Sequence, residues 1–276
     1  MKLSILLLMT LALAACGGSG GPPTNVEVTQ TSAEAVVTPV PLETMPAAAS
    51  IAEPTGDAPV GSAENVTIEA ADGLLIQATL LAPLTSGADP GVILLHMLGD
   101  DRTVWGEVGL AADLVAAGYA VLVVDMRGYG ETGGAPEWTL AADDLGRVWD
   151  AFTARDTVDR ARTAVVGASI GANMALRLGA EQADVGAVVL LSPGLDYRGV
   201  TTADQLAVYG DRPLLLVASE DDAYSVDSVR TLAEAAGSAD VQMFTDAGHG
   251  TAMFAAEPEL AALIIGWLDN QLASEP

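Results

Sequence analysis

Lysine is almost absent from this 276-residue chain: Lys2 is the only one, and ten arginines supply the other basic residues. Against them stand 37 acidic residues, which give a formal net charge of −26 at pH 7. Because nucleic-acid binding needs a basic face that contacts phosphates, this charge balance excludes nucleic acid as a partner. It also favours solubility and disfavours adsorption to anionic surfaces.

Cysteine occurs once, as Cys16, which excludes an intramolecular disulfide. One positive charge, Lys2, precedes the apolar residues 3–15. That run is too short to span a bilayer and is typical of the apolar core of a signal peptide. Its end, Leu13-Ala14-Ala15-Cys16, resembles the lipobox of bacterial lipoproteins. The resemblance implies cleavage before Cys16, lipidation of its thiol and anchoring on the extracytoplasmic face of a cell membrane; an ordinary secretory signal is the alternative.

Aromatic residues are missing from residues 17–60, whereas prolines recur there at positions 22, 23, 39, 41, 46, 54 and 59. Such a segment does not bury enough apolar area to offset the entropy lost on ordering. We therefore predict three parts: a signal peptide over residues 1–15, a lipidated and disordered tether over residues 16–61, and a globular domain over residues 62–276.

Short apolar runs alternate with helical patterns through the predicted domain. Residues 65–70 and 74–81 alternate apolar and polar positions around Ala71-Asp72-Gly73, which predicts a β-hairpin. Buried strands are then predicted at 91–95, 119–125, 164–166, 185–191, 213–218 and 241–245, and helices at 108–117, 139–153, 172–178, 226–236 and 258–272. Strands that alternate with helices indicate an α/β fold, with a mostly parallel sheet of about eight strands covered on both faces.

The stretch around Ser169 carries the strongest chemical signal. Residues 162–179 read R-T-A-V-V-G-A-S-I-G-A-N-M-A-L-R-L-G, so a β-branched strand turns directly into a helix at the serine. Gly167 and Gly171 leave room for a strained backbone and for close contact between strand and helix. This is the pattern of a nucleophile elbow, in which Ser169 projects from the sheet edge above a helix N-terminus.

Several segments resemble the α/β-hydrolase superfamily, and together they span about residues 62–272. These segments are His96-Met97-Leu98-Gly99 after an early strand, D-M-R-G-Y-G-E-T at residues 125–132, the Ser169 elbow, L-L-L-V-A-S-E-D-D at 214–222 and D-A-G-H-G at 246–250. They resemble the oxyanion motif, the arginine-glycine segment, the nucleophile, the acid loop and the histidine loop of that superfamily. Met97 and Ser219 depart from the pattern, since glycine is usual at both places.

The resemblance implies a catalytic triad in the chain order serine, acid, histidine. His249 follows Ser169 whereas His96 precedes it, so His249 is the expected base and His96 a shaping residue of the oxyanion loop. Alignment of the acid loop favours Asp222 as the acid, with Asp221 and Asp196 as alternatives. The expected oxyanion donors are the backbone N–H groups of Ile170 and Leu98, with Met97 as second choice for the latter.

The connection over residues 192–212 is too short for a large lid, so the expected substrate is a small or medium acyl compound. The sequence contains no phosphate loop followed by lysine and no cluster of metal ligands, so no cofactor and no metal are expected. The favoured function is hydrolysis of carboxylic esters through an acyl-enzyme intermediate. A serine peptidase of the same fold, or a non-catalytic surface binding protein, remain alternatives.

Overall fold

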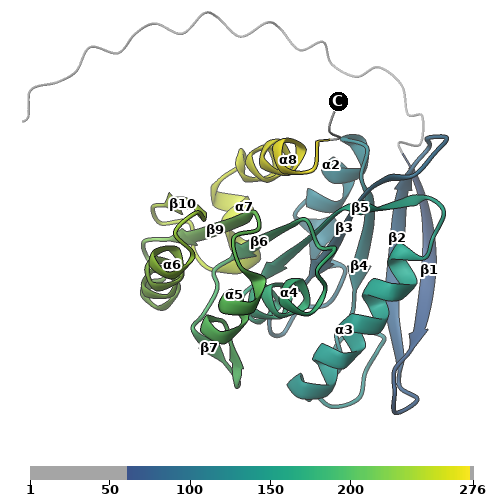
Figure 1. Ribbon diagram of the computed structural model, residues 1–276, viewed down its shortest axis with the longest axis horizontal. Coiled ribbons are helices and arrows are strands. Elements are labelled where there is room, and N and C mark those ends of the chain that lie inside the picture. Colours follow the sequence, from purple (N-terminus) through teal and green to yellow (C-terminus); the bar gives the residue numbers. More distant parts are fainter. Residues whose placement is uncertain (1–60, 274–276) are drawn as a thin grey trace, which may run out of the picture. The chain divides into compact units, whose positions relative to one another are not determined.

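The structure of the chain, a computed structural model, describes residues 61–273 (Figure 1). The predicted signal peptide, Cys16 and nearly all of the predicted tether lie outside the described residues. Within the described part, no single helix is both long and apolar enough to cross a membrane, although the consecutive segments Gly250–Ala256 and Leu260–Gln271 pass that test together with a bend of 113° between them.

One eight-stranded sheet forms the centre of the described part, in the order β1-β2-β4-β3-β5-β6-β9-β10. Its strands are β1 (Gly61–Glu69), β2 (Leu75–Pro83), β3 (Asp89–Leu95), β4 (Ala120–Val124), β5 (Val158–Ala168), β6 (Ala187–Leu191), β9 (Leu214–Ser219) and β10 (Asp240–Phe244). Strand β2 pairs antiparallel with both β1 and β4, and every other pair is parallel. The predicted hairpin and the mostly parallel sheet are therefore confirmed.

Helices cover both faces of the sheet, which explains why its central strands are apolar throughout (Figure 1). One face carries α3 (Trp138–Thr153), α4 (Ile170–Glu181), α5 (Ala203–Tyr209) and α6 (Ala223–Ala236). The other carries α1 (Val104–Glu107), α2 (Leu110–Ala116), α7 (Met253–Ala256) and α8 (Leu260–Gln271). Along β3, Ile93 and Leu95 pack on the first face while Val92 and Leu94 pack on the second.

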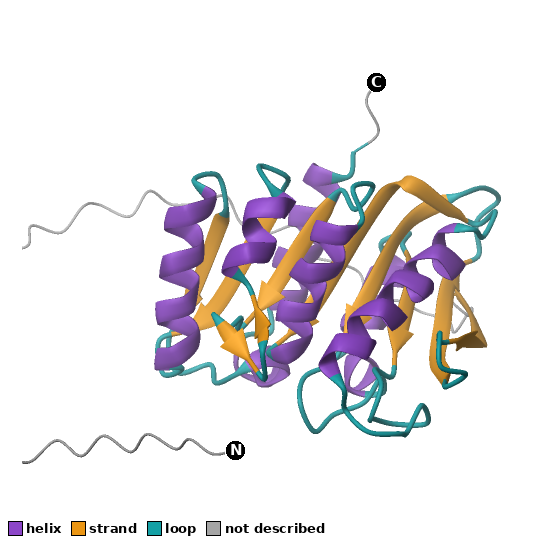
Figure 2. Ribbon diagram, turned by 60° about the horizontal axis from the view of Figure 1, so that its bottom comes forward, coloured by secondary structure: helices purple, strands orange, loops and turns teal. Residues whose placement is uncertain are grey.

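The connection after β6 is short, as the sequence predicts, but it contains a hairpin that local patterns did not indicate. Strands β7 (Asp196–Tyr197) and β8 (Val200–Thr201) pair antiparallel ahead of α5. They are too short for an alternating apolar pattern to reveal them. Figure 2 shows this hairpin and the long loop after β4 at the edge of the sheet to which most arrowheads point. Parallel strands deliver their following loops to one edge, where a site can form.

Candidate active site

Ser169 lies between the last residue of β5 and the first residue of α4. Its backbone has φ 53° and ψ −120°, a strained conformation for a residue with a side chain. Gly167 and Gly171 allow this turn, because a Cβ on Gly167 would overlap the Gly171 carbonyl and one on Gly171 would overlap the Leu95 carbonyl. The sharp turn thus leaves Ser169 8% exposed at the sheet edge.

Asp222 lies against His249, from loops that follow the neighbouring strands β9 and β10. The His249 Nδ1 atom is 2.5 Å from Asp222 Oδ2. The Ser225 backbone N–H donates to Asp222 Oδ1 at 3.3 Å, so the carboxylate also caps α6. Burial by itself raises the pKa of Asp222, but hydrogen bonds from the Ser225 and His249 side chains outweigh it and hold the pKa below its ordinary value. The carboxylate is therefore ionised at neutral pH.

The neighbouring Asp221 points elsewhere. Its Oδ1 accepts hydrogen bonds from the Ser219 hydroxyl and from the Gly248 N–H, the latter at 3.2 Å. The Ser219 hydroxyl oxygen in turn accepts from the Ala247 N–H at 2.8 Å. Asp221 and Ser219 therefore join the acid loop to the histidine loop. Asp196, the other alternative acid, accepts from the Gly199 N–H at 2.7 Å within the β7–β8 turn.

Three backbone N–H groups fix the loop that carries His249. Besides the bonds of Ala247 and Gly248 to the acid loop, the Gly250 N–H donates to the hydroxyl of buried Ser192 at 2.9 Å. Gly248 and Gly250 both have positive φ. The loop packs beside the elbow, since a Cβ on Gly250 would be 3.6 Å from the Ala168 Cβ.

Within the described residues, the Ser169 hydroxyl and the His249 ring are not joined by a hydrogen bond, and Tyr197 lies against the His249 ring. The Tyr197 ring meets His249 edge-on with 6.4 Å between centroids. Catalytic hydrogen bonds are often long in substrate-free enzymes and tighten when substrate binds. The arrangement therefore places a histidine against a carboxylate, on a loop that packs beside the elbow of Ser169.

His96 shapes the expected oxyanion loop, as the sequence indicates. Its Nε2 accepts the Met126 N–H at 3.1 Å, so the neutral ring carries its proton on Nδ1 and donates to the Met97 carbonyl at 2.8 Å. Burial lowers the pKa of His96 and keeps it neutral. Met97, which replaces the usual glycine, places its Sδ within 3.5 Å of the Thr251 hydroxyl and so links this loop to the histidine loop.

The two expected oxyanion donors, the N–H groups of Leu98 and Ile170, have no hydrogen-bond acceptor among residues 61–273. Leu98 follows β3 and Ile170 begins α4 after β5, so the two groups come from the ends of neighbouring strands. The first N–H groups of a helix have no partner within it and are available to an anion.

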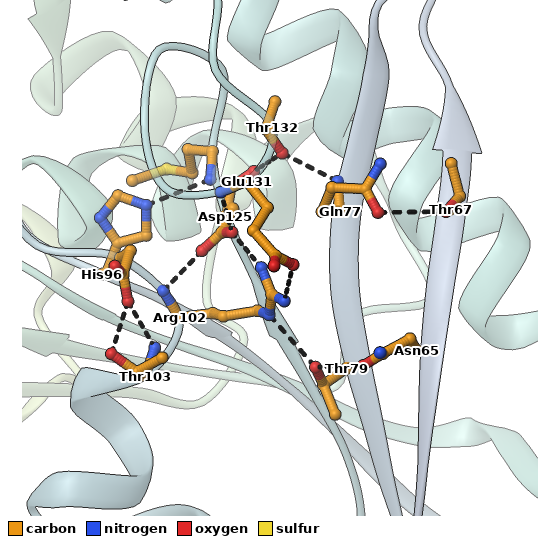
Figure 3. A network of polar contacts seen from close by, with 12 residues as sticks. Asn65, Thr67, Gln77, Thr79, His96, Arg102, Thr103, Asp125, Glu131 and Thr132 are labelled. Carbon is orange, nitrogen blue, oxygen red and sulfur yellow. Dashed lines mark hydrogen bonds and ion pairs between the residues drawn. The ribbon is translucent and has the colours of Figure 1, made fainter.

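A partly buried ionic network lies near His96 and the expected oxyanion loop (Figure 3). Asp125 is fully buried and accepts hydrogen bonds from the Arg102 and Glu131 N–H groups at 2.7 and 2.8 Å. The Arg102 guanidinium pairs with both carboxylates, Asp125 and Glu131. Removal of Arg102 would leave the buried charge of Asp125 unpaired, so the network fixes the loops after β3 and β4 against each other.

Local sequence reasoning missed several residues that build the site: Asn173, Ser192, Tyr197 and Ser225. Asn173 is fully buried, and its side chain exchanges three hydrogen bonds with Gly194 and Val200, at 2.7 to 3.0 Å. A polar residue inside the apolar helix 172–178 was the available signal for Asn173. Ser192, Tyr197 and Ser225 have no such sequence signal, because isolated serines and tyrosines are common in proteins. Among the described residues, no group of three or more His, Cys, Asp or Glu side chains is arranged to hold a metal ion.

Comparison with known proteins gives a family match over part of the chain and similar folds. Residues 88–208 match the family described as "Serine aminopeptidase, S33". An "uncharacterized protein" of Mycobacterium tuberculosis is 31% identical over 140 residues, which are 51% of this chain and 49% of that protein. The chain thus spans about half the length of this curated relative.

Two solved structures have a similar fold. An esterase of Pyrococcus furiosus has a TM-score of 0.66 at 20% identity, over 77% of this chain and 94% of that one. A dienelactone hydrolase from Anabaena variabilis has a TM-score of 0.64 at 21% identity, over 77% and 99%. The chain has the α/β-hydrolase fold. The family match and these similar structures support its assignment as an α/β-hydrolase.

Proposed function

We propose that the protein is a serine hydrolase that cleaves small or medium carboxylic esters, and that a lipid on Cys16 anchors it to the extracytoplasmic face of a cell membrane. The contact between His249 Nδ1 and Asp222 Oδ2, with Ser169 on its strained elbow beside the histidine loop, carries the proposal. The short connection after β6 supports a small substrate, because no large cap covers this edge of the described part.

Catalysis proceeds in two steps. His249 Nε2 takes the proton of Ser169 as its Oγ attacks the acyl carbon, and Asp222 stabilises the imidazolium. The Leu98 and Ile170 N–H groups stabilise the oxyanion. His249 then protonates the leaving oxygen, and the alcohol departs. Water, deprotonated by His249, attacks the acyl-enzyme; the bond between Ser169 Oγ and the acyl carbon breaks, Oγ recovers its proton and the acid is released.

The purified protein is expected to react with a fluorophosphonate probe at Ser169, because such probes label activated serines. Turnover should be seen on p-nitrophenyl or naphthyl esters of short and medium acyl length. Absence of labelling in a folded sample would contradict the proposal and favour a binding protein built on this fold.

A serine peptidase is the second candidate, because the family matched by residues 88–208 is described as aminopeptidases. A panel of aminoacyl anilides beside the esters distinguishes the two. Anilide cleavage at a higher kcat/KM than ester cleavage would favour the peptidase.

The membrane anchor rests on Leu13-Ala14-Ala15-Cys16 and is tested separately. Cys16→Ser is expected to release the protein from the membrane fraction or to leave it unprocessed, because a hydroxyl does not form the thioether to lipid. Ester hydrolysis should persist, since every residue of the proposed active site lies within residues 61–273 and Cys16 is not among them. A variant that matures and fractionates like the wild type would show that the lipoprotein assignment is wrong.

A further inference from the structure

Tyr197 is held in place by bonds from two helices to the β7–β8 hairpin. Asn173 on α4 binds Gly194, which precedes the hairpin, and Val200, the first residue of β8. On α6, the Tyr224 hydroxyl accepts from the Asp196 N–H at 3.0 Å, and the Ser228 hydroxyl accepts from the Leu195 N–H at 3.1 Å. The hairpin is therefore a rigid support rather than a free lid.

The Tyr197 side chain turns inward to the triad. Its hydroxyl lies 3.3 Å from the Ser225 hydroxyl and 3.4 Å from the Ser192 carbonyl. The ring meets His249 edge-on and packs against Tyr224 with 5.5 Å between centroids. Burial raises the pKa of the Tyr197 phenol, while the hydrogen bond with the Ser225 side chain acts in the opposite direction. The phenol is thus protonated at neutral pH.

Ser225 connects Tyr197 to the carboxylate of Asp222. Ser225 is fully buried in the first turn of α6, and its backbone N–H donates to Asp222 Oδ1. Its hydroxyl contributes to the low pKa of Asp222. With Oδ1 held by Ser225, Oδ2 faces His249. The chain of contacts runs from Tyr197 through Ser225 to Asp222 and His249.

We propose that Tyr197 and Ser225 are positioning residues of this site, which orient the Asp222 carboxylate against His249 from the side opposite the expected oxyanion loop. The sides follow from the sheet order: Leu98 follows β3 and Tyr197 follows β6, and these strands flank β5. The inference rests on the proposed ester hydrolysis. In this proposal, Tyr197 and Ser225 contact the triad without belonging to it and hold it in reactive geometry.

The kinetic test compares Tyr197→Phe, Ser225→Ala and the double variant on a p-nitrophenyl ester. Each single change is expected to lower kcat about tenfold with KM nearly unchanged, because a lost hydrogen bond in a charged network weakens transition-state stabilisation. The double variant should be little worse than either, since both residues belong to one chain of contacts.

Two hydroxyl deletions elsewhere serve as controls. Tyr209→Phe removes a hydroxyl that donates to the Pro213 carbonyl at 2.6 Å, and Thr153→Val removes one that donates to the Trp149 carbonyl at 2.9 Å. Both controls are expected to keep the wild-type kcat. If Tyr197→Phe and Ser225→Ala also keep it while Ser169→Ala is inactive, the inference is wrong and the proposed function stands.

A second measurement is independent of turnover. The chain has only two histidines, so the proton between His249 Nδ1 and Asp222 can be assigned in the far-downfield NMR spectrum by its loss in His249→Ala. Tyr197→Phe and Ser225→Ala are expected to displace this resonance, whereas Tyr209→Phe leaves it in place. An unchanged resonance in both variants would overturn the inference, whether or not the protein cleaves esters.

Discussion

Ser169→Ala is expected to reduce kcat for ester hydrolysis by about 10⁶-fold, close to the background rate of the remaining site. The nucleophile forms the covalent acyl-enzyme, and no other hydroxyl occupies the elbow between β5 and α4. The folded state should be little affected, because alanine only removes one oxygen atom. Thermal unfolding of the variant provides the check on folding.

His249→Ala is expected to cause a similar loss, and the double variant should be little worse than either single one. Once the nucleophile is gone its base has no proton to accept, so the two effects do not add. Steady-state kinetics of the three variants on one ester measures this. Near-full activity of Ser169→Ala, with contaminating hydrolases excluded, would show that the serine is only a turn residue.

Asp222→Asn is expected to lower kcat by about 10⁴-fold while the fold persists. The carboxylate accepts the Nδ1 proton of His249, fixes the tautomer that leaves Nε2 free, and stabilises the imidazolium formed during attack. An amide in its place presents no charge, and its NH₂ group favours the wrong tautomer.

Asp221→Asn is the matched control, one residue away with the same chemical change. Its Oδ1 accepts from the Ser219 hydroxyl and the Gly248 N–H, and an asparagine oxygen accepts the same bonds. We expect most of the activity to remain. If Asp221→Asn were the inactive variant and Asp222→Asn the active one, the triad would use Asp221 and the acid assignment would be off by one residue.

Most of the strands and helices could be predicted from local sequence patterns, but the β7–β8 hairpin could not. Apolar runs such as 91–95 and 185–191 predict buried strands. In the structure helices cover both faces of β3 and β6, which is why these strands are apolar on both sides. The elbow at Ser169 was also predictable, since glycine is required where strand and helix backbones approach closely. These signals are local: each depends on residues a few positions apart.

The contacts between side chains that are distant in the sequence depend on the tertiary structure. Asp221 and Asp222 are adjacent and identical in chemistry, yet Asp222 caps α6 and faces His249 while Asp221 joins two loops. Tyr197 and Ser225 are 28 residues apart and meet because β6 and β9 are neighbours in the sheet. Such contacts depend on strand order and on the direction in which each loop leaves its strand. Strand order and loop direction are set by the packing of the whole sheet, so a local pattern of apolar and polar residues does not encode them.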